Sequence, residues 1–175
     1  FSNTTPVTVP TGPAVVSSQI VVSGLPAFLF DLDVYAVLPH TYSSDLDVTV
    51  QSPAGTVVTL TSDNGLTTAN AFNGTLWNDS ADPGGQVPYA ENPLLTTDRY
   101  FPVHGTASTV VPEEPLAAFF GENPNGTWTL TVSDDAMDDG GTLSQWRLDF
   151  KTGACSGGST TTTSSTSTTT STSGT

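Results

Sequence analysis

The chain has 175 residues, about the length of one domain with a tail, and a formal charge of −14, since only Arg99, Arg147 and Lys151 are basic. Such a surface repels phosphate backbones and anionic headgroups, which excludes nucleic-acid binding and attachment to anionic membranes. No stretch approaches the roughly twenty apolar residues that span a bilayer, so no membrane insertion is expected. An acidic surface favours solubility and also attracts divalent cations.

Six segments predict β-strands, because they are rich in β-branched or aromatic residues and most alternate between apolar and polar positions. In chain order they are residues 14–22, 29–38, 46–51, 56–61, 127–133 and 144–150. Turn residues separate them, as in the Ser-Pro-Ala-Gly run at 52–55 and the Asn-Pro-Asn-Gly run at 123–126. No segment has helical periodicity over three turns with caps. The pattern therefore predicts an all-β domain.

The middle of the chain, residues 66–118, is less regular and predicts long loops with short strands. Many strands joined by long crossing connections indicate a jelly-roll β-sandwich rather than a meander. We expect this sandwich to occupy residues 1–152 and a separate low-complexity tail to occupy residues 153–175.

Two late strands each place large apolar side chains on one face, which predicts that they pair and contribute to one core. A platform for an aromatic ligand would use the same residue types. The apolar positions are Trp128, Leu130 and Val132 in the first strand and Trp146, Leu148 and Phe150 in the second.

The tail contains fifteen consecutive Ser and Thr residues at 159–173 and has no apolar group there, so it should not fold alone. We expect it to carry O-linked sugar or to dock on a neighbouring subunit. Because Cys155 is the only cysteine, an internal disulfide is excluded. Cys155 is a candidate for a disulfide between two chains, and a buried or unpaired thiol is the alternative. The candidate O-glycosylation sites are Thr160, Thr161, Thr162, Thr163, Thr166, Thr168, Thr169, Thr170 and Thr172.

Export is suggested by two features. The chain starts at Phe1 without a methionine, which fits removal of an export signal or a cloned fragment. Four N-x-S/T sequons are candidate N-glycosylation sites, although several would arise by chance in a chain so rich in Thr and Asn. Their asparagines are Asn3, Asn73, Asn78 and Asn125.

Several motifs together resemble the P domain, also called the P/Homo B domain. They are HTYSSDLDV at 40–48, SPAGT at 52–56, NPNGTW at 123–128, VSD at 132–134 leading to Asp139, GTL at 141–143 and WRL at 146–148. The resemblance runs in consistent order over residues 2–150. That domain follows the subtilisin-like catalytic domain of proprotein convertases and recurs in exported bacterial proteins.

The resemblance implies a jelly-roll sandwich that does no chemistry itself and supports the folding and stability of an attached protease. It also implies that His40 belongs to a structural His-Thr pair. This chain contains nothing that resembles the Asp, His and Ser motif regions of a subtilisin-like enzyme. The Ser/Thr tail is a second departure, and it shifts the expected role toward assembly or attachment.

Acidic motifs offer candidate cation ligands. Asp-Leu-Asp-Val occurs at 31–34 and at 45–48, and strand geometry would place each pair of carboxylates on one face. In the loop between the two aromatic strands, Asp134, Asp138 and Asp139 are a candidate calcium site, because Ca²⁺ takes six to eight oxygen ligands. Some related bacterial jelly-roll domains hold calcium. A solvated acidic turn is the alternative.

Catalysis is not expected. A hydrolytic site needs a nucleophile, a base and an orienting group that converge in space, and His40 and His104 are the only histidines. His104 lies in an irregular segment and is expected to be solvated.

Two functions compete. In the main hypothesis the chain is a structural subunit of an extracellular filament or surface layer, self-associating through its tail, which extends roughly 50 Å. In the alternative it is an accessory or adhesive P domain of a larger secreted protein, with the tail as a glycosylated linker. An enzyme is a distant third.

Overall fold

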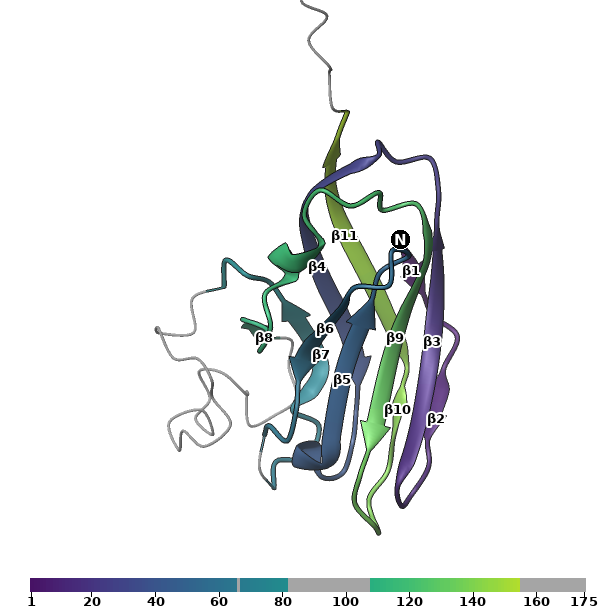
Figure 1. Cartoon of the computed structure of the whole chain (residues 1–175). Helices are drawn as coiled ribbons and strands as arrows, with labels where there is room; N and C mark the ends of the chain where they lie inside the picture. Colours follow the sequence, from purple (N-terminus) through teal and green to yellow (C-terminus); the bar gives the residue numbers. More distant parts are fainter. Residues whose placement is uncertain (66, 82–107, 155–175) are drawn as a thin grey trace, which may run out of the picture.

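The computed structural model describes residues 1–65, 67–81 and 108–154, and these form an all-β structure, as predicted (Figure 1). Within these described residues two short 3₁₀ turns, η1 (Ser43–Asp45) and η3 (Leu116–Phe119), interrupt the strands. Among the described residues no helix is long and apolar enough to cross a membrane. The strands are β1 (Ser2–Asn3), β2 (Val7–Val9), β3 (Ala14–Val22), β4 (Phe28–Leu38), β5 (Leu46–Gln51), β6 (Val57–Thr61), β7 (Phe72–Trp77), β8 (Ser108–Val110), β9 (Gly126–Asp134), β10 (Gly141–Leu143) and β11 (Gln145–Gly153).

The strands form two sheets that face each other as a sandwich (Figure 1). One sheet has the order β1-β11-β4-β7-β8 and the other the order β3-β9-β5-β6, while β10 pairs with β2 alone. Every pairing is antiparallel except that of β7 with β8. The chain crosses between the sheets from β3 to β4, from β4 to β5 and from β6 to β7, which confirms the predicted sandwich with long crossing connections.

The six predicted strands all form, with ends that differ by at most three residues. Alternation explains this success, because most apolar positions of β4, β5, β9 and β11 point inward and are buried, with exceptions such as the exposed Phe30 and the half-buried Phe150. The predicted domain boundary at residue 152 stays a prediction.

The predicted pairing of the two aromatic strands is wrong. Strand β9 lies in the four-stranded sheet and β11 in the five-stranded sheet, so they face each other across the core instead of sharing hydrogen bonds. Trp128 and Phe150 meet edge to face with ring centroids 5.4 Å apart. This contact confirms the prediction that the two strands contribute to one aromatic core. The pairing was mispredicted because alternation fixes which side chains point inward but does not fix which strands are neighbours.

The core contains all three tryptophans, and two of them have polar partners for the indole N–H. Trp128 donates to the carbonyl of Pro124 at 2.8 Å, and Trp146 donates to Ser18 Oγ at 2.9 Å. Such bonds remove the cost of burying the N–H group and fix the orientation of each ring.

Candidate functional site

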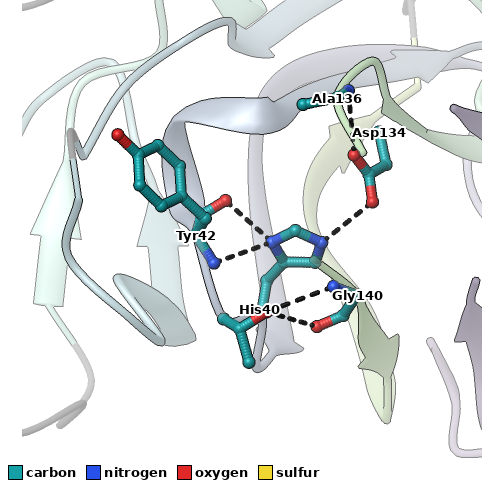
Figure 2. Close-up of polar contacts among 6 residues, drawn as sticks. His40, Tyr42, Asp134, Ala136 and Gly140 are labelled. Atoms are coloured by element: carbon teal, nitrogen blue, oxygen red, sulfur yellow. Dashed lines mark hydrogen bonds and ion pairs between the residues drawn. The ribbon is translucent and has the colours of Figure 1, made fainter. Parts of the chain in front are cut away.

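The turn that follows β4 carries a buried histidine at the end of the sandwich where β9 ends (Figure 2). His40 Nε2 lies 3.1 Å from Asp134 Oδ2, and neither side chain is exposed to solvent. On the other side of the ring, His40 Nδ1 lies 2.8 Å from the carbonyl oxygen and 3.3 Å from the amide nitrogen of Tyr42. The neutral ring with its proton on Nε2 donates to Asp134 and accepts from the Tyr42 amide, whereas a protonated ring donates to Asp134 and to the Tyr42 carbonyl.

Asp134 has no free oxygen. Its Oδ2 contacts His40, and its Oδ1 accepts a hydrogen bond from the amide of Ala136 at 3.3 Å. This second bond begins the turn that carries the remaining acidic residues. A buried carboxylate is stable only when it is paired in this way.

The same turn ties three loops together. The amide of Asn70 donates to the carbonyl of His40 at 2.8 Å, and Thr41 exchanges hydrogen bonds with the backbone of Gly140. At Gly141 a side chain would collide with the Pro39 carbonyl and the His40 ring, so only glycine fits. Both ring nitrogens of His40 are used, by Asp134 and Tyr42, and the ring is inaccessible to solvent. The His-Thr pair that the resemblance implies stays a prediction.

Asp45 lies beside this pair and has lost part of its solvation. Burial raises the pKa of the Asp45 carboxyl, and repulsion from Asp134 and Asp139 raises it further, while His40 lowers it. The backbone carbonyl of Asp45 accepts a hydrogen bond from the Asp135 amide at 3.0 Å, which joins the end of η1 to the acidic turn.

Asp138 and Asp139 do not share this arrangement. The Asp138 side chain is exposed and its φ is 78°, while Asp139 is half-buried. In residues 1–65, 67–81 and 108–154, no group of three or more His, Cys, Asp or Glu side chains is placed to hold a metal ion. A calcium site that includes Asp134, Asp138 and Asp139 stays a prediction.

The two Asp-Leu-Asp-Val copies behave differently. In β4 the copy has the predicted geometry, with Leu32 and Val34 fully buried and both carboxylates on the other face. Asp31 contacts Lys151 at 2.5 Å, while burial and then repulsion from Asp31 raise the pKa of Asp33. In the second copy the first carboxylate, that of Asp45, belongs to η1 instead of a strand.

The four sequon asparagines differ in how their amides are used. Asn125 donates to the Leu25 carbonyl at 2.8 Å and accepts from the Leu25 amide at 3.0 Å, and Asn3 donates to Gln19 and Ser18. Asn78 accepts from the Ser80 amide. Glycosylation at any of them stays a prediction. Cys155, His104 and the tail threonines lie outside the described residues.

Two carboxylates that the sequence did not single out hold distant segments. Asp79 accepts hydrogen bonds from the amides of Leu116 and Ala117 at 2.9 and 2.8 Å, which caps the start of η3. Glu113 accepts from the amide and hydroxyl of Ser62 at 3.0 and 2.8 Å and from the Asn64 amide group. No local pattern marks either residue, because the partners lie 37 to 51 positions away.

The chain is thus a β-sandwich domain with a buried His-Asp pair at one end of the sandwich. The chain belongs to the proprotein convertase P-domain family, whose model matches residues 29–150. This confirms the resemblance that the motifs indicated.

Two of the proteins that resemble this chain over a segment are proteases. The chain is 30% identical over 150 residues to a transglutaminase-activating metalloprotease of Streptomyces mobaraensis, covering 86% of this chain but only 15% of that protein. A serine protease of Aeromonas sobria has a similar fold, with 19% identity, a TM-score of 0.44 and coverage of 82% of this chain and 24% of that one. The same protease in complex with a chaperone matches with 17% identity, a TM-score of 0.42 and the same coverage.

The expectation of self-association into a polymer or surface layer is wrong. The metalloprotease relative contains the matching segment as only 15% of a longer chain, and the family is that of the proprotein convertase P domain. These two findings favour the alternative hypothesis of an accessory domain over that of a filament subunit.

Proposed function

We propose that this chain is the non-catalytic P domain of a larger exported protease-type protein and that it supports the folding and stability of the attached catalytic domain. The observation that carries the proposal is the family match over residues 29–150, combined with a metalloprotease relative of which the chain spans only 15%.

The geometry of the His40–Asp134 pair fits a non-catalytic, supporting role for the domain. His40 is the one histidine in the described residues, and its ring is inaccessible and bonded at both nitrogens. Asp134, which would have to orient a catalytic base, is itself buried. A general base must reach the proton that it removes, and this pair is shielded from any substrate.

The tail and the location form part of the same proposal. An exported domain followed by a hydroxyl-rich linker carrying O-linked sugar would keep its neighbours apart in solution. Intact mass before and after chemical release of O-glycans tests the tail. A mass equal to that of the bare polypeptide in material from the native source contradicts a glycosylated linker.

The domain's role is tested by producing the intact protein and a version that lacks residues 1–154. We expect the shortened protein to give at least tenfold less soluble, active protease. The matched variants are Asp134→Ala, which removes a buried partner, and Asp135→Ala, which alters an exposed side chain. A reading frame without a protease segment, or equal protease yield without the domain, contradicts the proposed function.

A further inference from the structure

One edge of the five-stranded sheet is only partly covered. Strand β1 pairs with β11 at Arg147 and Trp146, and the backbone of Phe1 exchanges two hydrogen bonds with that of Leu148, at 2.9 and 3.0 Å. Beyond Leu148, β11 continues to Gly153, past the short β1 (Figure 1). No other described segment pairs with β11 on this side.

Antiparallel geometry shows which groups this leaves open. Successive residues of a regular strand direct both backbone groups to opposite sides, so Phe150 points the same way as Leu148, toward the β1 edge. The register with β4 shifts between Lys151 and Thr152, but the extra residue, Phe30, is on β4, so the alternation of β11 continues and Thr152 also points toward the β1 edge. The backbone groups of the residues opposite Phe150 and Thr152 on β4 also point away from β11, which supports this assignment. Leu32, opposite Phe150, gives its amide to the Asp31 carboxylate, and Leu29, opposite Thr152, bonds away from β11.

The side chains at this edge are also incompletely covered. Phe1 is 44% exposed and packs edge to face on the half-buried Phe150, with ring centroids 5.9 Å apart. Phe150 in turn touches the fully buried Trp128. A residue placed opposite Phe150 would share its face of the sheet and shield a ring that belongs to the core.

We propose that the open edge of β11 from Phe150 to Gly153 is completed by an extended strand of the protease to which this domain is joined, running antiparallel to β11 in line with β1. This inference rests on the proposed function. The pairing of β1 already fixes its direction and register, because a polypeptide that stayed extended ahead of Phe1 would place every second residue opposite Phe150 and Thr152. Backbone bonds supply affinity, and an apolar side chain opposite Phe150 supplies selectivity.

Amide hydrogen exchange tests the proposal on the intact protein, on residues 1–175 and on residues 1–154. In both shorter forms the amides of Phe150 and Thr152 should exchange about 100-fold faster than those of Asp149 and Lys151, which face β4. In the intact protein they should be protected to a similar extent. Rapid exchange in an intact protein that does carry a protease overturns this inference and leaves the proposed function standing.

Two further outcomes overturn it. Protection in residues 1–175 that is lost in residues 1–154 assigns the strand to the tail. Protection in residues 1–154 shows that the edge is closed within the domain.

A pair of proline variants gives an independent test. Thr152→Pro removes an amide that faces the open edge, whereas Lys151→Pro removes one that faces β4. We expect Thr152→Pro to lower the melting temperature of the intact protein but not that of residues 1–154, and Lys151→Pro to lower both. Equal losses from the two variants in residues 1–154 overturn the proposal.

Discussion

His40 and Asp134 lie 94 positions apart in the chain, yet Nε2 of the first is 3.1 Å from Oδ2 of the second, with both side chains out of contact with water. The contact joins the end of β4 to the end of β9, and hence one sheet to the other. Around it, backbone bonds connect His40 to Asn70 and Thr41 to Gly140. The pair thus fastens three loops at one end of the sandwich.

Removing one member of the pair should be costly. In Asp134→Ala, His40 loses the acceptor at Nε2, and in His40→Ala a buried carboxylate loses its partner, so each should reduce the free energy of unfolding by about 3 kcal/mol or more. Urea denaturation of both single variants and of the double variant measures this. The double variant should cost less than the sum, and strict additivity would contradict a direct interaction.

The strands were predictable because alternation is local. The alternating pattern predicts which face of each strand is buried, as it does for Leu32 and Val34 in β4 and for Leu46 and Val48 in β5. The structure places all four side chains in the core. The neighbour of each strand was not predictable in the same way. Strands β9 and β11 carry the same pattern whether they lie side by side or face each other, and only the full topology separates the two.

The contacts of the candidate site could not be predicted from local sequence patterns either. Asp134 was a candidate calcium ligand because it stands among other carboxylates, and nothing near it in the sequence reveals that His40 would occupy it. Asp79 is a stronger example, since its two hydrogen bonds go to a 3₁₀ turn that begins 37 residues later. A contact between two polar side chains that lie far apart in the sequence produces no periodic sequence pattern, so it could not be predicted.

The cap provided by Asp79 should contribute measurably to stability. Asp79→Ala leaves the amides of Leu116 and Ala117 without their acceptor, so we expect a loss of about 1–2 kcal/mol in urea denaturation. Asp135→Ala removes an exposed carboxylate and should change stability by about 0.5 kcal/mol or less. Equal effects would show that the cap is unimportant.

Asp47 should make the domain less stable as the pH rises. Burial, then repulsion from Asp63, Asp135 and Glu113, raises the pKa of Asp47 above its ordinary value of 3.8. The folded state then binds the proton more tightly than the unfolded state, so stability falls as the pH rises from about that value through the higher folded pKa.

Replacing that carboxylate should reverse the effect. Asp47→Asn should raise the melting temperature at pH 7 by about 1–3 °C and leave it nearly unchanged at pH 3, as measured by calorimetry. Asp149→Asn is the matched control, because it removes a carboxylate that contacts Arg147 at 2.8 Å and should not be stabilising. A lower melting temperature for Asp47→Asn at pH 7 would contradict the conclusion that the Asp47 carboxylate destabilises the folded state.

The sequon asparagines should separate into structural and dispensable ones. Asn125→Ala removes two hydrogen bonds to the Leu25 backbone and should cost about 1–2 kcal/mol in urea denaturation. Asn73→Ala, on β7, removes an amide for which the described residues provide no side-chain hydrogen bond, and should cost about 0.5 kcal/mol or less. A larger loss at Asn73 than at Asn125 would contradict these assignments.

Calcium binding at the acidic turn should be weak, because Asp134 is committed to His40 and leaves Asp135, Asp138 and Asp139 as the carboxylates available there. A few accessible carboxylates supplemented by backbone oxygens correspond to the weak, roughly millimolar end of the range of calcium affinities. A folded-state ligand raises the melting temperature by mass action, so about 10 mM CaCl₂ should produce a rise that Asp138→Asn abolishes and that equal MgCl₂ does not reproduce. An unchanged melting temperature across that titration removes the calcium prediction, and a rise that survives Asp138→Asn places the ion elsewhere on the acidic surface.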